Sequence, residues 1–105
     1  MLNKVFLMGR MVRDPSERRT ANGKAVTNFT VAVDRDRDRE QTDFIDVVAW
    51  NGTAEFVSKY FRKGSMVILS GRLQMRKWED RDGNTRTSYE VLADQIYFGE
   101  AKNGA

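Results

Sequence analysis

The stretch Ser65–Phe98 reads SMVILSGRLQMRKWEDRDGNTRTSYEVLADQIYF. Its first part, Ser65–Trp78, predicts a long strand interrupted at Gly71, where a bulge or sharp bend lets a sheet curl toward closure. Residues 81–84, Arg-Asp-Gly-Asn, predict the turn at the tip of a hairpin. The segment Thr87–Phe98 returns as the last strand. A long hairpin that bends in its first strand suits a sheet that closes on itself.

Upstream of this hairpin the chain contains two further strand signals before the middle of the sequence. Asn3–Arg13 has apolar residues at both odd and even positions, which predicts a strand buried on both faces. Asp14-Pro15 ends this strand. A polar loop follows, with a turn at Asn22-Gly23. Ala25–Val33 alternates between two faces and predicts the second strand.

The third strand, Asp43–Trp50, has two faces of different character. Its aliphatic face carries Ile45, Val47 and Ala49, and we expect this face to belong to the core. The other face carries Phe44, Asp46, Val48 and Trp50. Two large aromatics beside a charge are unusual on a solvent face, so the pattern indicates a binding surface.

The remaining segments complete a recognisable order of elements. Asp34–Glu40 alternates in charge and has no apolar surface to bury, which predicts a mobile loop. Asn51-Gly52-Thr53 can cap a helix that runs to about Arg62 and is ended by Gly64. The order is that of an all-β, five-stranded OB-fold barrel with one short α-helix between strands 3 and 4. Such barrels bind oligonucleotides, oligosaccharides or proteins, so the site must decide the function.

Composition argues against several classes of function. The chain of 105 residues has no cysteine and no histidine, and 18 Lys+Arg against 15 Asp+Glu give a net charge of +3. Without thiols or imidazoles we expect no metal, no cofactor and no enzyme. No apolar run approaches the roughly 20 residues of a membrane span, and the N-terminus lacks a signal-peptide pattern. We therefore expect no membrane partner and a cytoplasmic protein.

Aromatic and basic side chains interleave along the later strands, and this composition is typical of proteins that bind single-stranded nucleic acid. Unpaired bases stack on aromatics at about 1–3 kcal/mol each, while cations contact phosphates and release counterions. The stacking candidates are Phe44, Trp50 and Trp78. The basic candidates on these strands are Lys63, Arg72, Arg76, Lys77 and Arg86.

The two tryptophans differ in how strongly the pattern supports a stacking role. Taken alone, Trp50 is better explained as a large core residue at the end of a strand. Trp78 lies near a hairpin tip, where there is little core to fill, which favours stacking. These contacts accept DNA or RNA alike, because the sequence shows no reader of the 2′-hydroxyl.

Short motifs spread over residues 2 to about 98 match one known family in order and spacing. They are Asn3-Lys4-Val5, Gly9-Arg10, Asp14-Pro15, Asn22-Gly23, Ala25-Val26, Asp43-Phe44, Val47-Val48, Tyr60 with Arg62-Lys63-Gly64-Ser65, Gly71-Arg72-Leu73 and Arg76-Lys77-Trp78. In this set the chain resembles the bacterial single-stranded DNA-binding (SSB) family.

The resemblance implies an OB-fold homotetramer that wraps single-stranded DNA and protects it in replication, recombination and repair. It implies stacking roles for Phe44, Trp50 and Trp78. It also implies phosphate contacts for Lys4, Arg18, Lys63 and Arg76. A first strand that is apolar on both faces supports self-association independently, because one small barrel covers only one of them. We assign residues 1–99 to the DNA-binding domain and residues 100–105 to a short flexible tail.

Three features depart from the family pattern. Many members carry a tryptophan in the second loop, where this chain has only the alternating charges of Asp34–Arg39. Asp46 replaces a basic residue of some members and puts a negative charge between Phe44 and Trp50. Members also end in an acidic tip that recruits partner proteins, whereas this chain stops at residues 103–105, Asn-Gly-Ala. Replication and repair proteins are therefore expected partners only if an acidic tail exists beyond this chain.

Two other classes of function stay open from the sequence. The first is an OB-fold protein-interaction module of replication restart, which would require Trp50 and Trp78 to be buried in the core or in a subunit contact. The second is a nuclease in which Asp43 and Asp46 hold a divalent ion. Residues three apart on a strand point to opposite faces, so these two carboxylates cannot share one metal.

Overall fold

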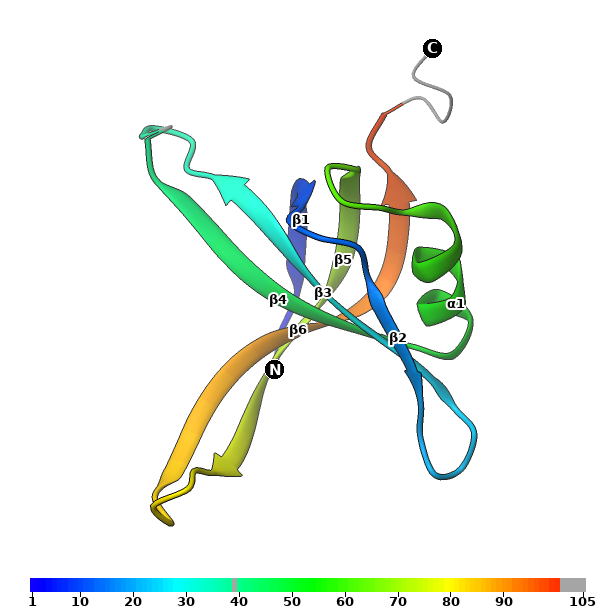
Figure 1. The fold of residues 1–105 in the computed structure, drawn as a ribbon. Coiled ribbons are helices and arrows are strands. Elements are labelled where there is room, and N and C mark those ends of the chain that lie inside the picture. The colour runs from blue at the N-terminus through cyan, green and yellow to red at the C-terminus, as the bar shows by residue number, and fades with distance from the viewer. Residues whose placement is uncertain (39, 101–105) are drawn as a thin grey trace.

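A computed structural model describes residues 1–38 and 40–100 of the chain. In chain order the elements are β1 (Val5–Met11), β2 (Ser16–Arg19), β3 (Ala25–Asp34), β4 (Thr42–Trp50), α1 (Asn51–Tyr60), β5 (Met66–Glu79) and β6 (Thr85–Phe98). The strands form one sheet in the order β1-β5-β6-β4-β3-β2, and β1 also pairs with β3. This second pairing closes five strands into a ring, with β2 attached along β3 (Figure 1). The predicted all-β fold with one short helix is confirmed.

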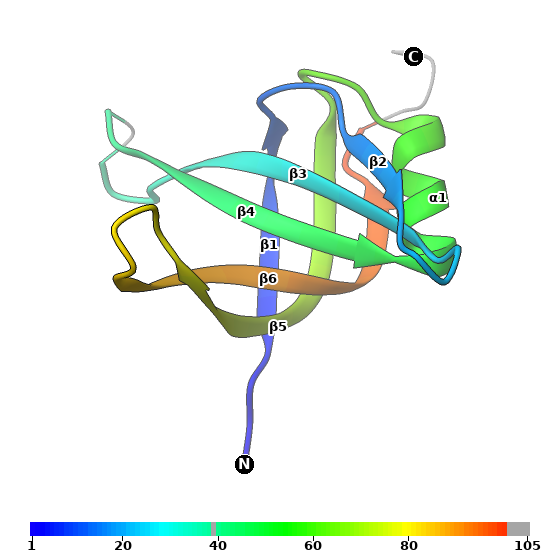
Figure 2. The ribbon, with the colours of Figure 1, turned by 60° about the horizontal axis from the view of Figure 1, so that its bottom comes forward.

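β5 bends at Gly71, where the sequence predicts a bulge. The register between β5 and β6 shifts between Ser70 and Gly71. A Cβ on Gly71 would collide with the carbonyl oxygen of Leu92 on β6, so only glycine allows the two backbones to approach this closely. Upstream of the bend β5 pairs with β1, and downstream it continues as a long hairpin with β6 (Figure 2).

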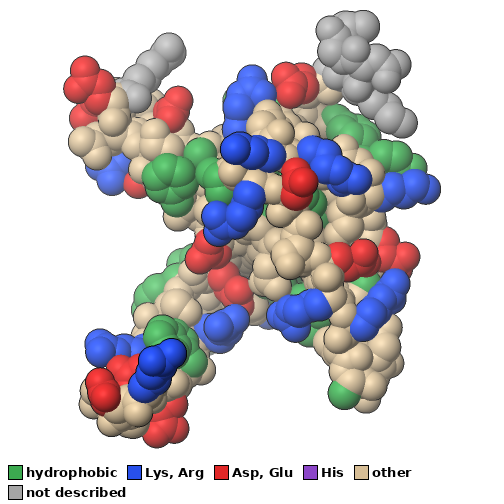
Figure 3. Space-filling model, in the orientation of Figure 1, with side chains coloured by type: hydrophobic (Ala, Val, Ile, Leu, Met, Phe, Trp, Pro, Cys, Tyr) green, Lys and Arg blue, Asp and Glu red, His purple; other side chains and the backbone are tan. Residues whose placement is uncertain are grey.

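Two hairpins project as arms from one side of the barrel (Figure 1), and the space-filling view shows a notch between them (Figure 3). One arm is the β3–β4 hairpin and the other is the β5–β6 hairpin. β4 and β6 pair in parallel at Val47↔Val91 and Val48↔Leu92. From this junction the two arms diverge, so the notch lies between side chains of β4 and β6.

The barrel interior is filled by alternate strand residues and by the inner side of α1. Its buried members include Met11, Phe29, Val31, Val47, Ala49, Val57, Phe61, Leu69 and Val91. The predicted core face of β4 is confirmed, since Val47 and Ala49 are buried and Ile45 is half-buried. Val48 was expected on the outer face, but it is buried because β3 and β6 flank it at the junction.

The sheet contains a sixth strand where the sequence predicts a loop. β2 is short, polar and exposed along its whole length, and it pairs with β3. The β2–β3 turn lies at the predicted Asn22-Gly23 position, with Gly23 at φ 81 and its N–H donating to the carbonyl of Thr20. The five strands of the ring are those predicted, and β2 is an additional edge strand in the predicted loop, because an all-polar segment gives no alternation of apolar residues to detect.

Helix α1 is shorter than the sequence predicts. It follows Trp50, and no side chain caps its first turn. It ends at Tyr60, because Phe61 turns into the core with an extended backbone (φ −115) and is buried. Gly64 does not end the helix; it lies in the following turn at φ 88.

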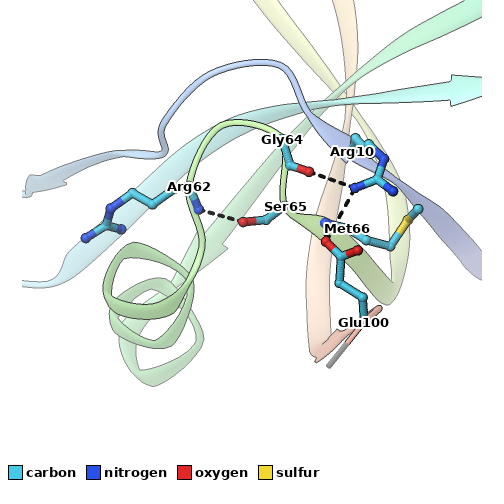
Figure 4. A network of polar contacts seen from close by, with 6 residues as sticks. All are labelled: Arg10, Arg62, Gly64, Ser65, Met66 and Glu100. Atoms are coloured by element: carbon cyan, nitrogen blue, oxygen red, sulfur yellow. Dashed lines mark hydrogen bonds and ion pairs between the residues drawn. The ribbon is translucent and has the colours of Figure 1, made fainter. Parts of the chain in front are cut away.

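That turn is held to β1, β5 and the C-terminal end of the described chain (Figure 4). Arg10 donates from Nη1 to the carbonyl of Gly64 (2.9 Å) and to Oε1 of Glu100 (3.4 Å). The N–H of Met66 donates to the same carboxylate oxygen at 3.3 Å. Glu100, which the sequence assigns to the tail, is therefore anchored; residues 101–105 of that tail lie outside the described part.

β1 is covered on one face only. Gly9 and Met11 are buried, whereas Phe6 is 77% and Met8 58% exposed. The prediction of a strand buried on both faces is therefore wrong for the single chain. Met8 lies beside Ile68 of β5, which lies beside Tyr97 of β6. We call the exposed set Phe6, Met8, Ile68 and Tyr97 the β1 patch.

Candidate nucleic-acid interface

Strand register shows which candidate side chains share one side of the sheet, because directly opposed residues point the same way. On β3 and β4, Val26 opposes Trp50 and Ala32 opposes Phe44. Arg18 of β2 opposes Val26 and so lies on this side as well. The aromatic side of β4 therefore continues onto β2.

The same side continues across the junction onto the β5–β6 arm. Val48 pairs with Leu92 of β6, which opposes Arg72 of β5. Farther along this arm Trp78 opposes Arg86. Because residues two apart on a strand share a side, Arg72, Arg76 and Trp78 all face outward together. We call this surface the outer face, defined by Arg18, Phe44, Trp50, Arg72, Arg76, Trp78 and Arg86.

All three aromatics of the outer face are open to solvent. Phe44 is 67% exposed, Trp78 46% and Trp50 39%. These fractions exclude a core position for either tryptophan within this chain. Large aromatics on a surface, aligned on one side of a sheet, are features of a binding site rather than of packing.

The arginines of the outer face differ in how much of their charge is free. Within the described residues, Arg72 and Arg76 lie beyond ion-pair distance of any carboxylate. Arg18 donates to Oδ1 of Asn28 at 3.3 Å, which leaves its charge uncompensated. Arg86 is neutralised in part, because its Nε donates to Oδ2 of Asp80 at 2.8 Å.

Asp80 organises the tip of the β5–β6 arm. Besides the Arg86 guanidinium, its carboxylate accepts hydrogen bonds from the backbone N–H groups of Asp82 and Asn84, both at 2.9 Å. These donors favour the ionised form, and they lower the pKa of Asp80, with Arg86 the main cause. The tip that carries Trp78 is thus held by one carboxylate.

Three predicted phosphate contacts lie off the outer face. Lys77 opposes Thr87 and points to the other side of the arm from Trp78. Lys4 precedes β1, with its Nζ 4.0 Å from a carboxylate oxygen of Asp94. Lys63 lies in the α1–β5 turn, where its backbone N–H donates to Asp14. All three are exposed.

The charged loop between β3 and β4 is partly neutralised by a carboxylate outside its alternating segment. Arg35 donates to Asp43 in a paired contact of 3.0 Å, and this carboxylate raises the pKa of Arg35. Asp46 lies on the side of β4 that Asp43 does not face, with Phe44 and Trp50, and its Oδ1 accepts from the hydroxyl of Thr30 at 2.8 Å. Arg39 of this loop lies outside the described residues. The described chain contains no cluster of three or more His, Cys, Asp or Glu side chains placed to hold a metal ion.

Comparison with known proteins agrees with this geometry. A sequence profile of the "Single-strand binding protein family" matches residues 2–99. The chain belongs to this family.

Three relatives illustrate the similarity, each named "Single-stranded DNA-binding protein". The protein of Fusobacterium nucleatum is 44% identical over 99% of this chain and 71% of its own length. That of Oceanobacillus iheyensis is 47% identical over 97% of this chain and 66% of its own length. That of Thermotoga maritima is 43% identical over 95% and 75%. The relatives are longer than the segment that this chain matches.

One part of the outer face of this single-strand binding protein could not be predicted from its sequence. A hollow of about 310 Å³ opens at the base of the notch, lined by Asn28, Thr30, Asp46, Arg76, Ser88 and Glu90 among others. Acidic side chains are visible there between the two arms (Figure 3). Only Asp46 and Arg76 were singled out from the sequence, because the pairing of β4 with β6 that assembles the hollow has no local signal. Within residues 1–38 and 40–100, no helix is long and apolar enough to cross a membrane.

Proposed function

We propose that this protein binds single-stranded DNA without sequence preference and protects it during replication, recombination and repair. The observation that carries the proposal is the outer face, where Phe44, Trp50 and Trp78 are exposed on the same side as three uncompensated arginines. Stacking and phosphate contacts together give affinity without reading base identity. Membership of the single-strand binding protein family supports the proposal.

The aromatics act as stacking platforms for unpaired bases. A duplex hides the flat faces of its bases inside the stack, so this chemistry selects single strands. Phe44 and Trp50 lie six residues apart on β4, and Trp78 lies on the other arm. A strand that contacts all three crosses the notch between the arms.

The cations act through the phosphates. Arg18, Arg72 and Arg76 lie on the outer face and supply the main contacts, and Arg86 contributes less because Asp80 neutralises part of its charge. Lys4 and Lys63 extend the basic path beyond the outer face. Lys77 points to the opposite side of its arm and is placed outside this path.

The assembly that we propose is a homotetramer, with the β1 patch as one subunit contact. Phe6 and Met8 are exposed in the single chain although both are large and apolar. Such a contiguous patch favours association, and several copies on one strand increase avidity through effective concentration. Sedimentation tests this: we expect a mass four times that of the chain, and Phe6→Lys combined with Met8→Lys lowers it. A mass of one chain for the unsubstituted protein contradicts the assembly.

Residues 1–99 form the DNA-binding domain in this proposal, which acts as a binding protein and not as an enzyme. The working site is single-stranded DNA exposed in the cytoplasm, at the nucleoid. Replication and repair proteins are proposed as partners only if an acidic tail exists beyond this chain.

Competition binding tests the proposed function. A fluorescently labelled oligo(dT) is bound, and its anisotropy is followed while unlabelled single-stranded or duplex DNA of the same length is added. We expect the single strand to compete and the duplex to compete much more weakly. Equal competition by both indicates binding through charge alone. No binding of the labelled strand at low salt supports the protein-interaction module instead.

A further inference from the structure

Asp46 has a position that general binding of single strands does not explain. It lies on the outer face between Phe44 and Trp50, on the same side of β4, and its side chain is exposed. A carboxylate here repels phosphates, and so weakens the contacts that the arginines supply. A ligand group that donates hydrogen bonds would instead be bound well by this carboxylate.

The hollow in the notch surrounds this carboxylate with polar groups from three strands besides its own. Thr30 of β3 donates its hydroxyl to Oδ1 of Asp46 at 2.8 Å, which orients the carboxylate and leaves Oδ2 free to accept. Across the notch stands Glu90 of β6, whose Oε1 accepts from Gln74 at 3.2 Å. Arg76 of β5 lines the same hollow. The hollow thus offers fixed acceptor oxygens beside one cation.

Phe44 borders this acceptor group directly. Asp46 and Glu90 also line a second hollow, which Phe44 borders, so the two hollows adjoin. Side chains two apart on a strand are separated by about 6.8 Å, close to the width of a nucleobase. A base that stacks on Phe44 therefore brings its hydrogen-bonding edge over Asp46, while Arg76 is available to the adjoining phosphate.

We propose that Asp46 makes this site selective for cytosine and adenine, which carry an exocyclic amino group at the 4- or 6-position, and that it disfavours thymine. The amino group of cytosine or adenine donates to the free carboxylate oxygen. Thymine offers an acceptor oxygen at the corresponding position, and two acceptors repel each other. The inference rests on the proposed function, and it adds a base preference at one position to binding that is otherwise independent of sequence.

Oligo(dC) and oligo(dT) of about 10 nucleotides, within the span of one OB-fold, test this directly. Both oligonucleotides carry pyrimidine bases of similar size. Their Kd values are measured with the unsubstituted protein and with Asp46→Asn. Asparagine keeps the shape and, with its Oδ1 accepting from Thr30, turns its amide N–H group toward the base, where it donates to the thymine oxygen and no longer accepts from cytosine. We expect the affinity for dT, relative to dC, to rise about fivefold, the effect of one hydrogen bond of average net strength.

The control variant is Glu79→Gln, which also removes one negative charge but lies on the β5–β6 arm, outside the residues that line the hollow. We expect it to leave the ratio of dC to dT affinity unchanged. If Asp46→Asn does the same, Asp46 acts only as a charge and the inference is wrong. If the unsubstituted protein binds neither oligonucleotide, the proposed function itself fails. Binding of both with an unchanged ratio in Asp46→Asn overturns the base preference alone.

Discussion

Arg76 and Lys77 are adjacent cations on one strand, and their substitution separates the contribution of the outer face from that of net charge. Arg76 opposes Ser88 on the outer face, whereas Lys77 opposes Thr87 on the other side of the arm. Arg76→Ala and Lys77→Ala each remove one positive charge at nearly the same point of the molecule. Both side chains are exposed, so we expect each substitution to change stability by no more than about 0.5 kcal/mol.

The size of the effect follows from the number of uncompensated face arginines. Each phosphate contact to a single strand adds about 0.7 to the slope of log K against log salt. Arg18, Arg72 and Arg76 therefore give a slope of about 2.1 per subunit, and removal of Arg76 lowers it to about 1.4. A fourfold rise in salt then weakens oligo(dT) binding about 18-fold in the unsubstituted protein and about 7-fold in Arg76→Ala.

The assay is fluorescence anisotropy of labelled oligo(dT) over a series of salt concentrations. Lys77→Ala is expected to keep the slope of the unsubstituted protein. Equal loss of slope in both variants would show that the cations act as a diffuse field, and a larger loss in Lys77→Ala would place the DNA on the other side of the arm. Either result refutes the assignment of the outer face.

Three further outcomes follow from the geometry. Trp78→Ala should weaken oligo(dT) binding by about 1–3 kcal/mol, the value of one stacked base, while thermal unfolding changes little because the side chain is exposed. Gly71→Ala should lower the free energy of unfolding by about 1–3 kcal/mol, because its Cβ collides with the backbone of β6; Gly52→Ala, which meets open space in α1, should raise it by about 0.5–1 kcal/mol. The ionised carboxylate of Asp80 stabilises the hairpin tip at pH values above the usual pKa range of aspartate. Because its pKa is lowered in the folded protein, this stability is lost as the pH falls through that lowered pKa. Amide exchange at the tip should accelerate there, and Asp80→Asn should abolish that pH dependence.

The fold was predictable where one residue or a regular alternation determines the geometry. Gly71 interrupts a strand pattern, and the bulge lies there because no larger residue fits against β6. β2 was not predictable, because its stability comes from pairing with β3 and not from apolar residues. The end of α1 was missed because the burial of Phe61 outweighs the local signal of Gly64.

The site was predictable within single strands and not between them. Parity alone places Phe44 and Trp50 on one side of β4. Their alignment with Trp78 depends on the parallel contact of β4 with β6, which involves residues far apart in sequence. The register of β5 with β6 also places Arg76 and Lys77 on opposite sides of the arm, although both are cations and composition alone does not distinguish them.

The central claim, that a single strand stacks across both arms of the outer face, is tested most directly with the two tryptophans as separate reporters. Trp50→Phe leaves only Trp78 to fluoresce, and Trp78→Phe leaves only Trp50. During titration with poly(dT) we expect the fluorescence of each single-tryptophan variant to be quenched strongly at saturation. Saturated binding that leaves either tryptophan unquenched contradicts a path across both arms, and loss of quenching in both variants contradicts stacking altogether.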